Sequence, residues 1–229
     1  MMHLINLPVT DAFYHLSLNH ELPLQPTLPI RKIKFYGPTE EATIVGDIGH
    51  INSRGNHERS LENQLAKLIE TEINFNHNPN YYDLKDDFDK IILATGDPQT
   101  SKNMGQWKQT DVSVKIIGAT IEGKFEATTV QMWLNHNFAP KGYGYLLPLG
   151  HKLASLAIAT PHDIVDWEKL WERFLAQLNF DFRIKDTFQI DKYEIGQTKT
   201  QEFDNTYIIG HAGGFIMPFL GFGQFSSII

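Results

Sequence analysis

A glycine-rich segment at residues 208–224 constrains the fold of this chain more than any other feature. It reads IIGHAGGFIMPFLGFGQ and holds five glycines among apolar side chains, directly after a strand-like run. Because glycine has no Cβ atom, such a segment lets the backbone turn sharply and approach a ligand closely. Taken alone, the segment is open to three interpretations: a membrane insert, a flexible tail, or a turn that cradles a ligand.

The composition indicates a folded globular protein. The chain has 229 residues, of which 41% are hydrophobic and 21% are charged, enough for one large domain or two small ones. The formal net charge of -7 argues against a broad basic surface for nucleic acid, so no nucleic-acid partner is expected. The chain contains no cysteine, which excludes disulfides, thiolate nucleophiles and cysteine-based metal sites.

No segment has the character of a signal peptide or of a membrane span. The first residues lack a positively charged region followed by an apolar core. The glycine-rich segment is the nearest to a span, but its glycines and His211 make it unsuited to a bilayer. We therefore expect no membrane span and a cytoplasmic location. The histidines have no metal-ligand spacing, so no metal site is expected.

The first half of the chain gives mixed signals. The first 50 residues are expected to form irregular structure and short strands, because four prolines fall between residues 23 and 38. Ser60 is a plausible N-cap for a helix that follows it. The apolar face predicted for this helix comprises Leu61, Leu65, Leu68 and Ile69.

A continuous apolar run at residues 91–94 is bounded by charges on one side and by Thr95 and Gly96 on the other. This pattern predicts a strand that is buried on both faces, as in a parallel sheet. Ligands of such sheets bind beyond the carboxyl ends of the strands. Gly96 therefore marks a candidate ligand edge.

The middle of the chain changes character. Between residues 112 and 160, short strand-like runs follow one another with tight turns, and apolar and polar residues alternate. This predicts an antiparallel sheet with one covered face. An amphipathic helix is predicted at residues 164–178, and strands return at 186–196 and 203–210. The order indicates an α+β fold: an α/β cofactor-binding part into which an antiparallel sheet is inserted.

Four segments, taken in order, resemble motifs of the geranylgeranyl reductase-like FAD-dependent oxidoreductases. The glycine-rich segment resembles the second FAD-binding motif of that family, with matching positions at Gly210, Ala212, Gly214, Pro218, Gly221 and Gly223. RGNHERSLENQLA, FDKIILATG and GYGYLLPLGHKLASLAIAT resemble three further motifs. The resemblance covers most of the chain from about Arg54 onward.

The resemblance implies FAD as cofactor and hydride transfer through the flavin to or from an apolar small molecule, with NAD(P)H as a candidate electron donor. No catalytic side chain is implied, because the flavin carries the redox chemistry. The residues that the resemblance places at FAD are Arg54, Gly96, Gly210, His211, Ala212, Gly213, Gly214, Pro218, Gly221 and Gly223. The residues that it places at the substrate are Trp133, Tyr143 and Tyr145. The oligomeric state is left open.

The resemblance also implies a domain division: a partial FAD-binding domain at 1–97, a substrate domain at 98–200 that includes the helix, and a return to the FAD-binding domain at 201–229.

The sequence departs from the family pattern at two places. The family's N-terminal G-x-G-x-x-G unit has no counterpart, and His211 replaces an acidic residue. A second hypothesis follows: a truncated or degenerate relative that is a non-catalytic binding module or needs a missing N-terminal segment.

For most of these residues an ordinary structural role is the competing interpretation. The glycines could simply allow a strand and a helix to pack, and the aromatic residues favour strands in any case. Arg54 could be a surface residue, and His211 could be a polar loop residue with no part in chemistry.

Overall fold

The computed structural model describes residues 2–5, 9–55, 57–163 and 166–216, and it divides into two compact units. Unit 1 comprises the described residues up to Ala66 together with Ser113–Tyr193. Unit 2 comprises Lys67–Val112 together with the described residues from Glu194 onward. Two long strands, β5 (Trp107–Gly123) and β9 (Phe182–Thr198), run from one unit into the other.

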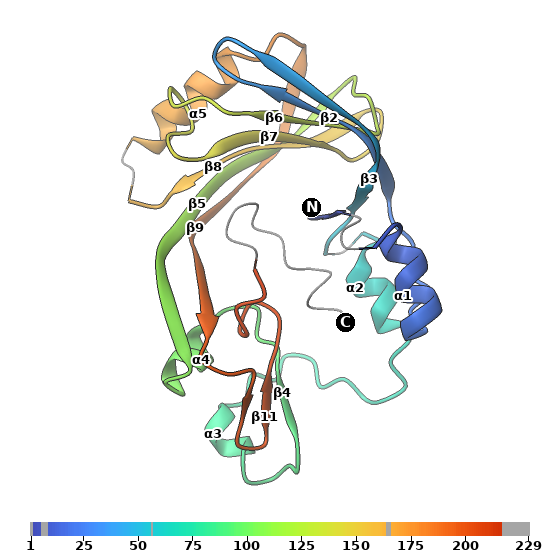
Figure 1. Cartoon of the computed structure of the whole chain (residues 1–229), viewed down its shortest axis with the longest axis vertical. Helices are drawn as coiled ribbons and strands as arrows, with labels where there is room; N and C mark the ends of the chain where they lie inside the picture. Colours follow the sequence, from blue (N-terminus) through green and yellow to red (C-terminus); the bar gives the residue numbers. More distant parts are fainter. Residues whose placement is uncertain (1, 6–8, 56, 164–165, 217–229) are drawn as a thin grey trace. The chain divides into compact units, whose positions relative to one another are not determined.

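Unit 1 is built on an eight-stranded mixed sheet in the order β1-β3-β2-β6-β7-β8-β5-β9 (Figure 1). Its other strands are β1 (Met2–Ile5), β2 (Leu28–Tyr36), β3 (Glu41–Asn52), β6 (Thr129–Trp133), β7 (Tyr143–Pro148) and β8 (Leu153–Pro161). Strands β6, β7, β8 and β5 pair antiparallel in that order, which confirms the expected antiparallel sheet. Strands β2 and β6 pair in parallel. The α+β class is confirmed.

The core of unit 1 lies between this sheet and helix α5 (Trp167–Ala176), which covers one face (Figure 1). The helix buries Trp167, Leu170 and Phe174, as its apolar stripe predicts. The expectation of a single covered face is wrong for β8, where every residue from Ala154 to Thr160 is buried. The β8 residues outside the α5 cluster are small, and two of them, Ala157 and Ala159, pair with Tyr145 and Tyr143 of β7.

The N-terminal region is more regular than its prolines predict. Helix α1 (Ala12–His20) begins at Asp11, whose carboxylate accepts a 3.0 Å hydrogen bond from the amide of Tyr14. Strands β2 and β3 form a long hairpin with a register shift between Ile30 and Lys32. The prolines lie before and after these strands or at the start of β2, where a missing amide does not break the ladder.

Helix α2 (Leu61–Ala66) begins as expected, because the Ser60 hydroxyl accepts a 3.2 Å hydrogen bond from the amide of Asn63. The predicted apolar face is wrong beyond the first turn. Leu68 and Ile69 lie outside the helix and are exposed. Only Leu61 of this helix is buried, and a short helix without packing partners does not extend.

Unit 2 contains a three-stranded sheet in the order β10-β11-β4. Its elements are α3 (Tyr81–Leu84), β4 (Ile91–Leu93), α4 (Gln99–Asn103), β10 (Glu202–Phe203) and β11 (Thr206–Ile208), in addition to parts of β5 and β9. The boundaries between the two compact units follow residues 66, 112 and 193, whereas the boundaries expected between the functional domains follow residues 97 and 200. The functional division stays a prediction.

Candidate functional site

Strands β4 and β11 of unit 2 form the parallel pair that the apolar run at 91–94 predicts. Ile92 pairs with Tyr207 and Leu93 with Ile208, and the amide of Ile209 donates a 3.0 Å hydrogen bond to the carbonyl of Leu93. Both strands therefore end side by side, and a glycine follows each of them. The expected burial on both faces is wrong, because the Ile92 side chain is 67% exposed.

The segment from Gly210 to Gly214 forms a compact turn that two buried hydroxyl groups anchor. Ser101 donates a 2.7 Å hydrogen bond to the carbonyl of Ala212, and Thr198 donates one of 3.0 Å to the carbonyl of Gly213. Ala212 is fully buried and packs with Leu93, Ile208 and Met104. The segment is therefore an ordered part of unit 2 and not a flexible tail.

The glycines of this turn serve two different purposes. A Cβ atom on Gly213 would lie 2.5 Å from the Ile208 carbonyl, and one on Gly214 would lie 2.7 Å from the backbone of Gly196. Packing therefore explains Gly213, and packing together with a left-handed φ of 75° explains Gly214. Gly96 and Gly210 adopt left-handed φ values of 78° and 60°, and no atom of the described residues lies within 4 Å of their Cβ positions.

Hydrogen bonds within the turn use several of its amides. The amides of Gly213 and Phe215 donate to the Gly210 carbonyl at 3.1 and 3.0 Å, and that of Gly214 donates to the His211 carbonyl at 3.1 Å. These amides are not available to a ligand. Gly96 and Gly210, with open space beside their backbone at the carboxyl ends of parallel strands, are the positions where a ligand could approach closely.

His211 lies between two backbone carbonyl groups of unit 2. Its Nδ1 atom is 2.8 Å from the oxygen of Gly96, and its Nε2 atom is 2.7 Å from the oxygen of Glu194. The Trp107 ring meets the imidazole edge to face at 6.4 Å between centroids. The imidazole thus connects the ends of β4 and β11 to β9. The sequence showed only that His211 stands where the family has an acidic residue, and it did not predict this connection.

The other expected FAD residues are placed as follows. Arg54 belongs to unit 1, where its guanidinium forms an ion pair with Glu62, and both side chains are largely exposed. Its positive charge lowers the pKa of Tyr193, although burial of that phenol raises it more. Pro218, Gly221 and Gly223 lie outside the described residues.

The three expected substrate residues do not share one face of the unit 1 sheet. Trp133 is buried under α5, stacked on Tyr36 at 5.3 Å and edge-on to Phe174 at 5.3 Å. Gly144 pairs with Trp133, and a Cβ on Gly144 would meet the Phe174 ring at 2.6 Å. Tyr143 and Tyr145 flank Gly144, so they point to the opposite face.

Tyr143 and Tyr145 therefore stand together, apart from Trp133. Their ring centroids are 6.1 Å apart, and burial raises the pKa of both phenols, that of Tyr145 well above its usual range. In the next strand Tyr143 pairs with Ala159 and Tyr145 with Ala157. The two tyrosines thus form an aromatic pair beside small residues. Whether this pair or Trp133 contacts a substrate stays a prediction.

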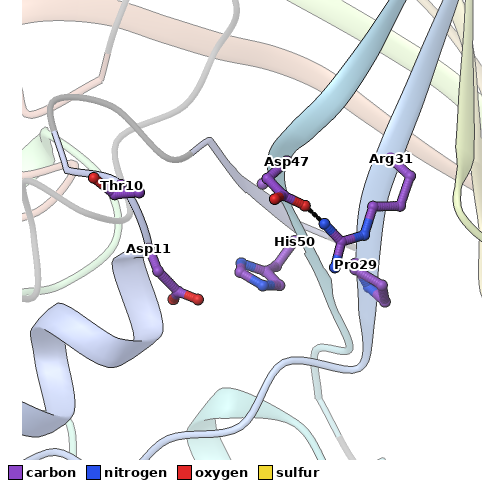
Figure 2. Close-up of a pocket in the computed structure, with 7 residues that line it drawn as sticks. Thr10, Asp11, Pro29, Arg31, Asp47 and His50 are labelled. Carbon is purple, nitrogen blue, oxygen red and sulfur yellow. Dashed lines mark ion pairs between the residues drawn. The ribbon is translucent and has the colours of Figure 1, made fainter.

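A polar pocket of about 180 Å³ lies elsewhere in unit 1, and no sequence motif pointed to it (Figure 2). Its lining residues are Thr10, Asp11, Pro29, Arg31, Asp47, Gly49 and His50. Arg31 and Asp47 form an ion pair in the lining, and His50 lies between this pair and Asp11 (Figure 2). Burial lowers the pKa of His50 most, with Arg31 acting in the same direction and Asp11 opposing.

Two further observations bear on the kind of site. Within the described ranges, no group of three or more His, Asp or Glu side chains is arranged to hold a metal ion. None of the helices in the described part of the chain is long and apolar enough to cross a membrane.

Comparison with known proteins identifies the architecture. No protein-family model matches the chain, and no curated protein matches its sequence. A geranylgeranyl bacteriochlorophyll reductase-like protein from Thermoplasma acidophilum superposes with a TM-score of 0.71 over 98% of this chain, at 14% sequence identity. The chain has the fold of a geranylgeranyl reductase-like flavoprotein. The resemblance predicted from the sequence is thus confirmed for the fold.

Two other solved structures support the same fold. A flavin-dependent brominase matches the whole chain at a TM-score of 0.63 and 12% identity, with 67% of its own length covered. A flavoprotein/dehydrogenase from Cytophaga hutchinsonii matches 87% of the chain at a TM-score of 0.58 and 14% identity. The chain spans 66% of the Thermoplasma protein and 58% of the Cytophaga protein.

Proposed function

We propose that this chain binds FAD and belongs to an FAD-dependent oxidoreductase that acts on an apolar small molecule. The observation that carries the proposal is the paired ending of β4 and β11. Two parallel strands stop side by side, each is followed by a left-handed glycine, and no atom of the described part of the chain fills the Cβ position of either glycine. The fold shared with flavoproteins makes FAD the ligand that best suits this edge.

The residues present fit such a cofactor. Gly96 and Gly210 leave their backbone open on the side of the missing Cβ atoms. The indole nitrogen of Trp107, which packs near His211, is buried and has no hydrogen-bond partner among the described residues. A buried donor of this kind is costly unless a partner is supplied. Bound FAD would supply the hydride chemistry, and the chain would supply binding and orientation.

An aromatic pair in unit 1 supports the apolar substrate. Tyr143 and Tyr145 face away from the α5 core, beside the small residues Ala157 and Ala159. Burial raises the pKa of both phenols, so their surroundings are apolar and suit an uncharged ligand. NAD(P)H as the electron donor is a separate expectation. No contact among the described residues supports or opposes it.

Titration of the purified chain with FAD, followed by quenching of flavin fluorescence, tests the proposal. Gly96→Ala and Gly210→Ala should each weaken binding, because the new methyl group occupies the open side of the backbone. Gly105→Ala is the matched control, since Gly105 has a similar φ of 68° and equally open surroundings but lies after α4. Equal effects of all three substitutions would contradict the placement of FAD at this edge.

A second candidate is a non-catalytic binding module, or a part that needs a further polypeptide segment. The observation that favours it is the exposed apolar surface of unit 2. Ile92 is 67% exposed and Phe88 55% exposed, and among the described residues β4 is an edge strand. Parallel strands are ordinarily covered on both faces. A surface of this kind is typical of an interaction site.

The same titration separates the two candidates. A chain that is folded by circular dichroism and binds no FAD at saturating concentrations supports the second candidate over the first. Ile92→Lys should then reduce binding of an apolar dye without lowering Tm. Ile184→Lys is the control, because Ile184 is 41% exposed on β9 in unit 1. Equal dye binding by both variants and the parent chain would count against an interaction surface at β4.

A further inference from the structure

The placement of His211 determines how many protons its ring must carry. Nδ1 is 2.8 Å from the Gly96 oxygen and Nε2 is 2.7 Å from the Glu194 oxygen. Both partners are backbone carbonyl groups, which only accept hydrogen bonds. These contacts depend on heavy-atom positions, so the choice of tautomer does not affect them.

A neutral imidazole cannot satisfy both carbonyl groups. It has one N–H donor and one nitrogen with a lone pair, and that lone pair would face a second acceptor at hydrogen-bond distance. An imidazolium ion has two N–H donors in the geometry that the two oxygens require. Hydrogen bonds from a charged donor are also stronger than neutral ones.

Charged groups of both signs lie near the ring. Within two residues of Gly96, Trp107 and Glu194, which contact the imidazole, the charged side chains are Asp97, Lys108, Lys192 and Glu194. The Glu194 carboxylate forms an ion pair with Lys102. The Asp97 carboxylate accepts a 2.8 Å hydrogen bond from the amide of Gln99. Because both ring nitrogens face carbonyl oxygens, these two acceptors favour a second proton on the ring.

We propose that His211 is held as an imidazolium ion and is a positioning residue that joins the loops after β4 and β11 to β9. Deprotonation removes one of the two hydrogen bonds and the positive charge at the candidate cofactor edge. The consequence for FAD, whose diphosphate is anionic, rests on the proposed function.

Nuclear magnetic resonance of histidine nitrogen atoms tests the protonation directly and without FAD. At about pH 7, where an ordinary histidine is mostly neutral, the resonances lost in His211→Gln should show protons on both ring nitrogens. His162 is the control, because its Nδ1 lies 3.2 Å from the Ser113 hydroxyl, which can donate or accept. A single protonated nitrogen on His211 would overturn the proposal.

The pH dependence of FAD binding tests the positioning role. Between about pH 6 and about pH 9, the Kd of the parent chain should rise roughly tenfold, the effect of losing one charge-assisted hydrogen bond. His211→Arg keeps two donors and the charge, so its Kd should stay level. His211→Gln should bind weakly at both pH values. An equal rise in Kd for the parent chain and His211→Arg would overturn the positioning role.

The protonation of His211 and the binding of FAD are tested by separate measurements, so one can fail without the other. A doubly protonated His211 in a chain that binds no FAD would leave this inference standing and defeat the proposed function. A neutral His211 in a chain that binds FAD would do the reverse. If His211→Gln does not fold, His211→Arg provides the assignment of the resonances, because it also removes the histidine signal.

Discussion

Ser101 and Ala212, 111 residues apart in the sequence, are joined by a buried hydrogen bond of 2.7 Å from the Ser101 hydroxyl to the Ala212 carbonyl. Ser101 lies in α4 and Ala212 in the turn after β11, and both are fully buried. This contact holds the glycine-rich turn against the helix that follows β4. The order of the candidate cofactor edge therefore depends on a serine that no sequence motif singled out.

Ser101→Ala should lower the free energy of unfolding by about 1–3 kcal/mol, because it leaves the buried Ala212 carbonyl without its donor. Urea denaturation followed by tryptophan fluorescence measures the change. Thr200→Ala is the control: its hydroxyl also donates to a backbone carbonyl, that of Glu202 at 2.8 Å, but this contact is exposed. A loss of similar size in the control would show that burial does not decide the effect.

Gly214→Ala should be among the most damaging substitutions in unit 2. The left-handed φ of 75° costs about 1–2 kcal/mol for a residue with a Cβ atom. The overlap with the backbone of Gly196 and Gln197 at 2.7 Å adds about 1–3 kcal/mol.

Comparison with Gly105→Ala isolates the cost of the overlap at Gly214. Gly105 has a similar left-handed φ of 68°, but no atom of the described residues lies within 4 Å of its Cβ position. Both free energies of unfolding come from the same denaturation experiment. If the two variants lose equal stability, the close approach of the backbone at Gly214 does not matter.

The sequence predicted the two strands and the glycine-rich turn because these depend on local patterns, whereas it did not name the partner of the first strand. Ile91–Leu93 is a short apolar run that ends near a glycine, and the structure pairs it with the strand before Gly210. The sequence could not show which glycines are required by close packing and which leave open space beside the backbone. The crowding at Gly213 comes from the Ile208 carbonyl and the Phe215 ring, and that at Gly214 from β9. Such distances exist only in the folded chain.

Long-range pairing explains two features of unit 1 that the sequence did not show. The proline-containing N-terminal region forms long strands because β2 pairs with β3 on one side and β6 on the other. Local propensity does not include such long-range pairing. The family resemblance placed Trp133, Tyr143 and Tyr145 together at the substrate. The register between β6 and β7 places Trp133 opposite Gly144 and so on the other face.

His50 should make the folded state more sensitive to acid. Burial lowers its pKa, and its ring packs edge-on against Phe13 at 5.0 Å. Below about pH 6.5, the ordinary value for histidine, the unfolded chain takes up a proton at this position more readily than the folded chain. The free energy of unfolding should therefore rise with pH up to that value and then level off.

Thermal unfolding at a series of pH values measures this dependence, and His50→Gln should flatten it. His20→Gln, at an exposed histidine in the last turn of α1, is the control and should leave the pH dependence unchanged. An unchanged slope in His50→Gln would mean that other groups cause the acid sensitivity.

The two faces of β6 and β7 predict opposite outcomes for their aromatic residues. Trp133→Ala should cost about 3–5 kcal/mol, the usual price of removing a large core aromatic, because Trp133 is only 8% exposed between Tyr36 and Phe174. Tyr145→Phe removes only a hydroxyl on the other face and should change stability by less than about 1 kcal/mol. Denaturation curves measure the stability of both variants. For Tyr145→Phe, the affinity for an apolar ligand such as a prenyl alcohol is measured as well. Weaker ligand binding by Tyr145→Phe at unchanged stability would assign that face to the substrate, whereas a large loss of stability would show that the hydroxyl is part of the core.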